Sequence, residues 1–379
     1  MEPTATANVE IIKSSGAFSE RKADSEVLTV FSAAGFKGII EPPYAPGDLS
    51  SYYQMNSYHQ RCVQTKALVT AGLGFDIVCN THTEENAQNE PKPATSESDL
   101  ILEFIKNNEM NTGQTFIEML INFQTDFEVF GYSFLETVRD SKGALKLLCH
   151  IPAKNSALVQ NPETMLIELL QTVNNKTQKF SPDEFLMIKN YNPDNRYYGL
   201  PEYISALPAI LLDREMMEYN ISRLQNNAIP DLIVSVSGTQ LTQEQKDTMK
   251  DFWNNSFKGA GNSGKTLLIE TIAKDSQIQV TEIKSTYRDG AFRLAKRECR
   301  DEIIASHGVP PILLGIKTSG SIGSGKDIIE QVRTFKEIII EPRQRRLEHA
   351  LNSLFATEFG ITECKFKLKN INLTESNQD

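Results

Sequence analysis

The chain has 379 residues, of which 40% are hydrophobic, so it can bury a full core in one large domain or in two to three smaller ones. Its 39 basic and 49 acidic side chains give a net charge of −10 at pH 7, which argues against ordinary nucleic-acid binding through a basic patch. The five cysteines form no CxxC pair and the five histidines no HExxH pattern, so we expect neither a metal site nor a disulfide framework, and a reducing compartment is favoured. The polar start of the chain does not resemble a signal peptide, and no run of 18 apolar residues predicts a membrane span.

The first half of the chain predicts short helices followed by antiparallel strands. A flexible polar arm, residues 1–40, precedes a helix over Asn56–Ala71 and a strand over Phe75–Cys79. The polar, proline-containing stretch Thr81–Ser98 predicts an exposed loop. The further predicted elements are helices near Asp99–Asn107 and Gly113–Glu128 and strands over Gly131–Arg139, Ala144–His150, Ala157–Gln160, Met165–Val173 and Phe185–Lys189. This part is therefore expected to be α+β and mostly antiparallel.

A long helix and a small module occupy the middle of the chain. The turn-rich segment 192–201 marks a boundary, and a helix is predicted over Glu202–Asn227. After Pro230, a strand over Asp231–Ser237 leads to a helix over Gln243–Phe257, which begins with a capping box formed by Thr242 and Gln245. Two more strands, Lys265–Thr271 and Gln277–Lys284, complete a β-α-β-β unit.

The stretch after this module predicts two helices separated by a pliable loop. The first runs over Tyr287–His307, where Phe292, Ala295, Cys299 and Ile303 share one face, and Gly308 ends it. The loop Lys317–Lys326 consists almost entirely of Gly, Ser and Thr between its two lysines, which is typical of a linker or a working part. A second helix starts at Asp327 and is expected to break at Pro342, and Glu363–Leu373 predicts a last strand.

The segment Gly259–Thr266 matches the phosphate-binding pattern GxxxxGK[ST] in full. That pattern binds phosphate when a strand precedes the loop and a helix follows it, because the helix N-terminus supplies the N–H groups. Here the predicted helix precedes the loop and the strand follows, so a solvated turn is favoured over a nucleotide site. A second near match, Gly320–Asp327, has a carboxylate where a Ser or Thr would bind the metal ion. No nucleotide or other cofactor is therefore expected.

The helix over Tyr287–His307 carries several basic side chains, but acidic ones are interleaved with them. The spacing predicts i,i+4 ion pairs between Asp289 and Arg293 and between Arg297 and Asp301, on a solvated or subunit-facing surface. The sequence has no GxSxG or other catalytic pattern. We therefore expect no catalytic residues and no enzyme activity.

Four stretches, taken in their order and spacing from about residue 40 to residue 360, resemble a known family. They are Glu41–Tyr44 with Tyr58–Ala67 and Ala71–Phe75; Asp126–Leu135 with Ile151 and Pro152; Tyr198–Glu202 at the start of a long helix; and His307–Gly315. The chain resembles the portal proteins of tailed bacteriophages and prophages, notably the PBSX-like group.

The resemblance implies the fold and the domains of a phage portal. The domains it implies are an α/β wing over 41–200, stem helix 1 over 201–227, a β-α-β-β clip over 228–284, stem helix 2 over 285–308, a tunnel loop over 309–326, and a long kinked helix with a C-terminal wing segment over 327–379. The helical crown of the family would be short or absent.

The resemblance also implies the function, the partners and the sites. The protein would form a ring, usually dodecameric, in the capsid portal vertex of the virion, after assembly in the host cytoplasm. Double-stranded DNA would pass through its channel without sequence specificity, and the ring would meet the terminase large subunit, a head–tail adaptor and the major capsid or scaffold protein, with no membrane partner. The implied site residues are Lys317, Thr318, Ser319, Ser321, Ser324 and Lys326 facing DNA; Lys258, Asn262 and Lys265 for terminase and adaptor; and Arg293, Arg297, Arg300 and Asp301 between subunits. Two alternatives stay open: a nucleotide-binding protein that uses Gly259–Thr266, and an oligomeric scaffold without a DNA role.

Overall fold

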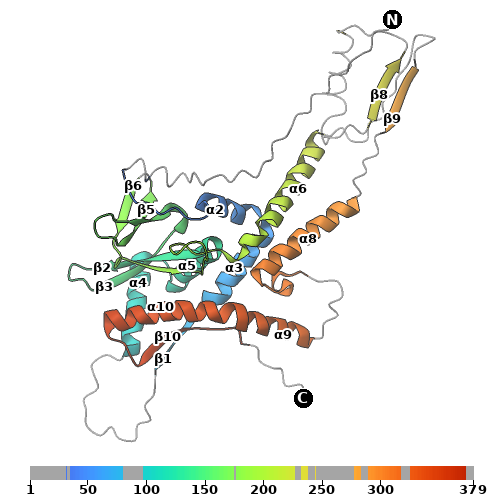
Figure 1. Ribbon diagram of the computed structural model, residues 1–379. Coiled ribbons are helices and arrows are strands. Elements are labelled where there is room, and N and C mark those ends of the chain that lie inside the picture. The colour runs from blue at the N-terminus through green and yellow to red at the C-terminus, as the bar shows by residue number, and fades with distance from the viewer. Residues whose placement is uncertain are drawn as a thin grey trace, which may run out of the picture.

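A computed structural model of the chain has a globular body from which two helices project toward a small hairpin (Figure 1). The structure describes residues 31, 35–79, 97–174, 176–226, 232–237, 244, 277–282, 289–316 and 325–372. Within these ranges, no helix is long and apolar enough to cross a membrane. Helix and antiparallel sheet are mixed throughout, as the sequence predicts.

The body combines helices with three small antiparallel sheets. Their strand orders are β3-β2-β7, β4-β5-β6 and β1-β10. Its helices are α2 (Pro46–Met55), α3 (Ser57–Ala71), α4 (Glu97–Thr112) and α5 (Phe116–Phe130). Its strands are β1 (Phe75–Cys79), β2 (Tyr132–Arg139), β3 (Leu145–Ile151), β4 (Ser156–Gln160), β5 (Ile167–Val173), β6 (Lys176–Phe180) and β7 (Phe185–Lys189), with the single turn η1 (Ala153–Asn155). Strand β6, which is polar and half-exposed, is the one strand of this part that the sequence did not predict.

Local signals set the ends of α5 and of the hairpin that follows it. A capping box begins α5, in which the Thr115 hydroxyl accepts from the Glu118 N–H while the Glu118 carboxylate accepts from the Thr115 N–H. The helix ends at Gly131, whose φ of 80° closes the last turn without a Cβ clash. In the β2–β3 turn, one carboxylate oxygen of Asp140 accepts hydrogen bonds from the N–H groups of Lys142 and Ala144.

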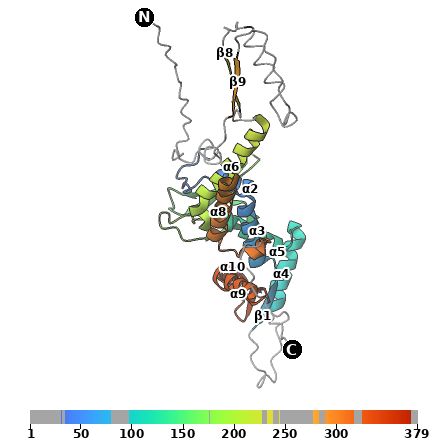
Figure 2. The same cartoon turned by 90° about the vertical axis from the view of Figure 1, so that its right-hand side faces the viewer.

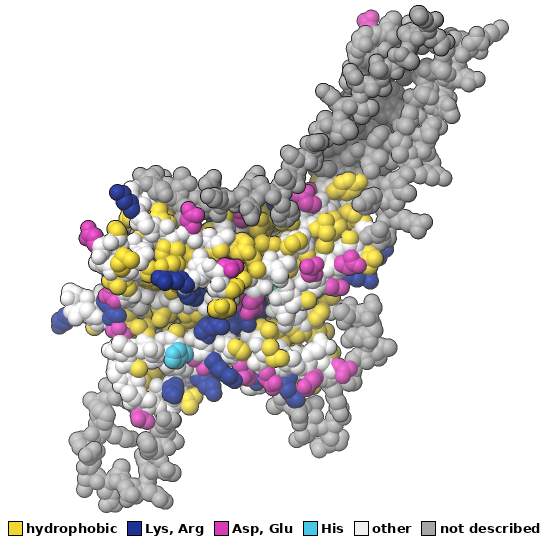
Figure 3. All heavy atoms as spheres, viewed as in Figure 1, with side chains coloured by type: hydrophobic (Ala, Val, Ile, Leu, Met, Phe, Trp, Pro, Cys, Tyr) yellow, Lys and Arg dark blue, Asp and Glu magenta, His cyan; other side chains and the backbone are white. Residues whose placement is uncertain are grey.

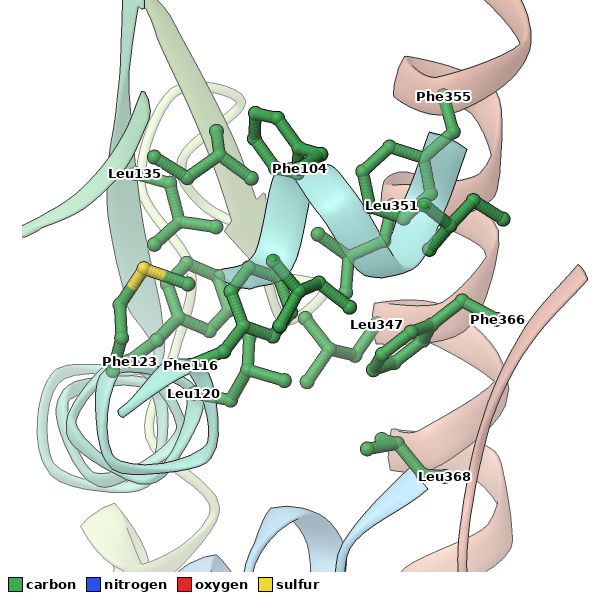
Figure 4. Close-up of a cluster of buried hydrophobic side chains, with 14 of the residues drawn as sticks. Phe104, Phe116, Leu120, Phe123, Leu135, Leu347, Leu351, Phe355, Phe366 and Leu368 are labelled. Atoms are coloured by element: carbon green, nitrogen blue, oxygen red, sulfur yellow. The ribbon is translucent and has the colours of Figure 1, made fainter. Parts of the chain in front are cut away.

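The main hydrophobic cluster lies between α4, α5, β10 and the last long helix, and is called the apolar core below (Figure 4). Aromatic rings dominate it, and Phe366 from β10 stacks on Phe75 from β1 with 4.9 Å between ring centroids. Ten of its members are labelled in the close-up: Phe104, Phe116, Leu120, Phe123, Leu135, Leu347, Leu351, Phe355, Phe366 and Leu368. β1 and β10, which are far apart in the sequence, are thus joined through one core.

The projecting pair consists of α6 (Leu207–Asn226), which follows the 3-10 turn η2 (Glu202–Ala206), and α8 (Asp289–His307). The two helices pack against each other in both views (Figures 1 and 2). Beyond them lies the antiparallel hairpin β8 (Leu232–Ser237) and β9 (Gln277–Glu282). The predicted helix from Glu202 is confirmed except in its first turn, which is tighter because it follows Pro201.

The C-terminal helix runs through Pro342, so the predicted break there is wrong. After η4 (Pro311–Leu314), the chain forms α9 (Gly325–Phe335), the π-helical turn η5 (Lys336–Ile340) and α10 (Glu341–Phe359) without interruption. Pro342 lies in the first turn of α10, where a missing N–H costs little because the π turn has already shifted the hydrogen-bond register. The resulting rod crosses the body in Figure 1 and is seen nearly end-on in Figure 2.

The predicted last strand is confirmed as β10 (Cys364–Leu368), which pairs antiparallel with β1. The pairing places Cys79 opposite Cys364, and the two form a disulfide across a sequence separation of 285 residues. The expectation of unpaired, reduced cysteines is therefore wrong for this pair. Cysteine spacing along the sequence could not show it, because the partners meet only through the tertiary pairing of the strands.

Candidate functional site

Polar side chains from all four family-like stretches meet inside the body. His59 and Lys66 come from α3, Glu128 from α5, and Glu202 from η2. His307 closes the set from the end of α8. Together with Arg343 from α10, Tyr203 from η2, Asn56 and Asp213, these residues are called the buried junction below. It joins the body to both projecting helices and to the C-terminal rod.

Two cations and two carboxylates alternate at the centre of the buried junction. Lys66 pairs with Glu128 and lies 3.4 Å from the Glu202 carboxylate. Arg343 donates from Nε to Glu128 Oε1 at 2.5 Å and also pairs with Glu202. The side chains of Lys66, Glu128 and Arg343 are at most 6% exposed, whereas that of Glu202 is 39% exposed. The four formal charges cancel, which makes their burial tolerable.

Burial and pairing act against each other on the titration of these groups. Burial alone raises the pKa of Glu128, but Lys66 and Arg343 outweigh it and lower that pKa to about 2. For Arg343, burial lowers the pKa, whereas Glu128 and Glu202 raise it, with a net upward shift. Both groups are therefore charged at neutral pH. A further hydrogen bond from Gln124 Nε2 to Glu128 Oε1, at 2.8 Å, satisfies the carboxylate.

Two buried histidines lie beside these charges. His59 Nδ1 and His307 Nε2 are 2.8 Å apart, so one ring donates a hydrogen bond to the other. Their rings stack at 5.0 Å, and the ring of Tyr203 lies 4.0 Å from that of His59. Burial first, and the Lys66 charge second, lower the pKa of His59 to about 3 and hold that of His307 well below its usual range. Both histidines are therefore neutral at neutral pH.

Asn56 extends the buried junction to α6. Its side-chain oxygen caps α3 by accepting from the N–H of His59 at 2.9 Å, and its Nδ2 donates to Asp213 at 3.1 Å. The Tyr203 hydroxyl donates to the Val129 carbonyl at 2.9 Å, which ties η2 to the end of α5. The base of the projecting helix pair is thus fixed by hydrogen bonds as well as by packing.

The predicted subunit-contact residues lie on α8, which buries the face predicted for it. Cys299 and Ile303 are buried, and Phe292 and Ala295 pack beside them, whereas Arg293 and Arg297 are exposed. The predicted pair between Arg297 and Asp301 is wrong: Asp301 pairs with its neighbour Arg300 at 2.8 Å. The guanidinium of Arg300 reaches that carboxylate without crossing a helical turn.

An apolar groove lies between the C-terminal end of α8 and the rod formed by α9 and η5. Its volume is about 770 Å³. Ile304, Val309 and Phe335 are among its apolar lining residues, and Asp301, Asp327 and Glu330 add acidic groups.

The other predicted site residues are not described by the structure. Residues 317–324 of the predicted tunnel loop lie outside the described ranges, and Lys326 is described only as part of α9. Lys258, Asn262 and Lys265, together with the phosphate-pattern segment Gly259–Thr266, also lie outside them. In the described ranges, no group of three or more His, Cys, Asp or Glu side chains could hold a metal ion.

Sequence reasoning missed the buried junction, although it singled out the stretches that form it. One signal was present: Lys66 lies one helical turn after the apolar Cys62 in the predicted helix, and at a buried position an unpaired cation would be costly. That position indicates a buried carboxylate partner. It does not indicate which of the 49 acidic residues supplies it.

Comparison with known proteins gives one family. The family model described as "Phage portal protein" matches residues 59–379. An uncharacterised protein of Rickettsia bellii is 28% identical over 278 residues, which are 70% of this chain and 66% of that protein. The probable portal protein of Escherichia phage P2 is 24% identical over 225 residues, 59% of this chain and 64% of its own length. The matched part thus spans less than two thirds of these curated relatives.

Solved structures agree with the fold. A chain from the neck of a native gene transfer agent particle, computed with C12 symmetry, superposes with a TM-score of 0.61 at 20% identity, covering 90% of this chain and 88% of that one. An HK97 family phage portal protein from Corynebacterium diphtheriae gives a TM-score of 0.51 at 12% identity, covering 84% of this chain and 94% of that chain. At these identities the likeness concerns the fold.

Proposed function

The chain belongs to the phage portal protein family, and we propose that copies of it form a ring at a capsid vertex, with an axial channel through which DNA is packaged and ejected. The observation that carries the proposal is the family match over residues 59–379, together with a fold that resembles both a particle neck and a phage portal. A twelvefold ring is the expected assembly.

Lateral contact between copies would use the surfaces of the projecting helices. Along α6, the side chains of Leu212, Met217 and Ile221 are about half exposed, and Leu294 on α8 is 54% exposed. Hydrophobic side chains are visible along α6 in the space-filling view (Figure 3). Exposed apolar positions beside charged ones are typical of contacts between subunits. The exposed arginines Arg293 and Arg297, with Arg300 and Asp301, would supply the polar part of this contact.

DNA would pass the segment 317–326 in the channel. An acidic protein with one lysine at each end of that segment would offer few phosphate contacts per copy, each exposed and salt-screened. Weak contacts suit a conduit, because they break as the duplex advances. The groove beside α9 would give the flanking helices room for a neighbouring copy.

The hairpin β8–β9 and the residues between its strands would form the clip, with Lys258, Asn262 and Lys265 facing the terminase large subunit and later a head–tail adaptor. The body would meet the major capsid or scaffold protein. We propose no catalytic role and no cofactor, so the protein would be structural in the virion, after assembly in the host cytoplasm. The phosphate-pattern segment would be a surface turn, and Lys265→Ala is expected to leave ATP affinity unchanged in calorimetry.

Electron microscopy of the purified full chain tests the proposal directly. Rings with an axial channel, twelvefold in class averages, are the expected result. A monodisperse monomer or a closed dimer without a channel, at concentrations where the protein is folded, would contradict it. The scaffold alternative predicts rings that show no packaging defect when the channel segment is altered.

Deletion of 319–324 separates that alternative from a DNA conduit. We expect the deletion to leave folding and ring assembly intact and to impair genome packaging or retention. A deletion in the exposed turn at Lys142 and Gly143 serves as the control, because that turn lies on the body. Normal packaging and retention by the 319–324 deletion would show that this segment does not act on DNA in the channel.

A further inference from the structure

The disulfide between Cys79 and Cys364 joins the two-stranded sheet of the body. β1 and β10 form a two-stranded sheet of five residue pairs, and such a pair is marginally stable by itself. The disulfide lies at the end of the ladder, opposite the Phe75–Leu368 pair. It therefore links the last residue of β1 to the first residue of β10.

The other edge of β10 is held by side chains rather than by a strand. Asn352 on α10 donates from Nδ2 to the Phe366 carbonyl and accepts from the Phe366 N–H, at 2.9 and 2.8 Å. Glu348 accepts from the Leu368 N–H at 2.7 Å. At the start of the strand, Glu97 accepts from the N–H of Cys364 at 2.8 Å. Glu97 also accepts from the N–H groups of Thr362 and Glu363. These contacts position β10 through several hydrogen bonds, which can still open locally.

The five cysteines of the chain differ sharply in accessibility. Cys62 and Cys299 are buried, and burial raises the pKa of both thiols, that of Cys62 to about 12. Cys149 is half-buried and unpaired, and burial raises its pKa as well. Cys79 is half-buried at the end of an edge ladder, whereas Cys364 is 8% exposed. Cys79 is therefore the more accessible residue of the pair, and a stepwise exchange reaction would start there.

We propose that Cys79 and Cys364 are a reversible thiol–disulfide site that reacts with small disulfides and thiols of the glutathione class, and that its closed form locks β10 onto the body. Closure starts when the Cys79 thiolate attacks a small disulfide, which forms a mixed disulfide and releases one small thiolate. The Cys364 thiolate then attacks the Cys79 sulfur, forms the internal bond and releases the second small thiolate. The two cysteines lose two protons and two electrons, and the small disulfide takes up both electrons. Two small thiols reverse the reaction.

The lock acts on the last described strand and on the core beneath it. Cys364, Phe366 and Leu368 are members of the apolar core, so opening of β10 exposes that core. Because the bond links residues 285 apart, it removes a large share of the freedom of the unfolded chain. The protein is thus expected to be pliable at this edge in a reducing medium and fixed in an oxidising one. The inference does not depend on ring assembly.

The test uses the full chain equilibrated in buffers of varied reduced and oxidised glutathione. Non-reducing digestion and mass spectrometry should find the peptides of Cys79 and Cys364 linked in oxidised glutathione and separate in reduced glutathione. Hydrogen exchange in β10 should be about tenfold faster in the reduced form, and the thermal midpoint lower by about 5 °C. Cys149→Ser should keep both responses, and Cys79→Ser should abolish both while folding like the reduced wild type.

Two results would overturn the proposal. One is the absence of the linked peptide after equilibration with oxidised glutathione, with all five thiols still free. The other is that the linked peptide forms, but reduction speeds hydrogen exchange in β10 by the same amount in the wild type and in Cys79→Ser. A Cys364→Ala variant, which keeps an apolar side chain in the core, separates loss of the bond from loss of packing.

Discussion

The apolar core and the buried junction are neighbours that share two helices, yet they are held together by different forces. On α5, Phe127 packs in the core while the next residue, Glu128, is the central carboxylate of the junction. On α10, Leu347 lies in the core and Arg343, one turn earlier, lies in the junction. The core depends on buried apolar area, whereas the junction depends on every buried charge keeping its partner.

This difference has a structural consequence. Apolar side chains tolerate several packings of similar volume. The core therefore brings α4, α5 and α10 together without fixing their exact relative positions. Paired buried charges tolerate few alternative arrangements, because a small displacement leaves a buried charge unpaired. We infer that the junction sets the angle at which α6 and α8 leave the body, since Glu202 and His307 lie at the base of those helices. A ring built from many copies would need that angle to be reproducible.

The largest expected effect follows from removing the central carboxylate. Glu128→Ala leaves Lys66 and Arg343 buried without their shared partner, and should cost about 3–5 kcal/mol in free energy of unfolding. Chemical denaturation of the protein at pH 7.5 measures it. The matched control is Glu218→Ala, which removes one partner of the exposed i,i+4 pair with Arg214 and should change little. A cost below about 1 kcal/mol for Glu128→Ala would show that the junction is solvated.

The triple variant Lys66→Met, Glu128→Leu, Arg343→Met tests whether the buried charges contribute to stability or to the angle of the projecting helices. Replacing the whole buried set by apolar groups of similar volume should recover most of the stability lost in Glu128→Ala. If the inference about helix angle holds, the recovered protein should still form fewer regular rings than the wild type in microscopy. Stable protein with normal rings would mean that the charges do not set the geometry.

The matching change in the apolar core is Leu351→Ala. Leu351 is fully buried, so its truncation should cost about 3 kcal/mol through lost transfer energy and a residual cavity. In contrast to junction variants, this loss should be the same at pH 7.5 and pH 5.5, because no titrating group changes. A loss that grows on acidification would couple the core to the junction.

Between pH 7.5 and 5.5, acidification should act on the two buried histidines of the junction. His59 and His307 have pKa values lowered by burial, so the unfolded chain takes up protons below about pH 6.5 that the folded chain refuses. The stability that they contribute is thus present above that pH and is lost as the pH falls toward about 3. Moving from pH 7.5 to 5.5 should cost about 3 kcal/mol, about 1.4 kcal/mol for each histidine. The carboxylate of Glu128, with its pKa near 2, adds its own loss only between about pH 4.5 and 2.

A variant tests whether the buried histidines cause this pH dependence. His307→Asn should reduce the slope of stability against pH between 7.5 and 5.5, because it removes one of the two buried imidazoles. An unchanged slope in His307→Asn would place the proton uptake elsewhere.

The sequence predicted much of the core and little of the junction, for a physical reason. Helical periodicity identified the buried face of α8, and strand alternation with turn residues identified β1, β2, β3 and β7. These signals are local. The contacts between Lys66 and Glu202, and between His59 and His307, link residues 136 and 248 positions apart and leave no local pattern. The Cys79–Cys364 bond, which links residues 285 positions apart, could not be predicted for the same reason.

The smallest expected effect comes from a surface ion pair that has the same chemistry as the junction. Arg300 and Asp301 form an arginine–carboxylate pair at 2.8 Å, like Arg343 and Glu128, but the Asp301 side chain is 57% exposed. Solvent screens this pair and hydrates either group once the other is gone, so Asp301→Asn should change the free energy of unfolding by about 0.5 kcal/mol or less. If α8 lies between copies, the same variant should still weaken ring assembly, seen as a higher concentration threshold in size-exclusion chromatography. Arg214→Gln, at the exposed pair on α6, serves as a control for surface charge. A stability loss near that of Glu128→Ala would mean that burial does not distinguish the two sites, and unchanged assembly would remove Asp301 from the subunit contact.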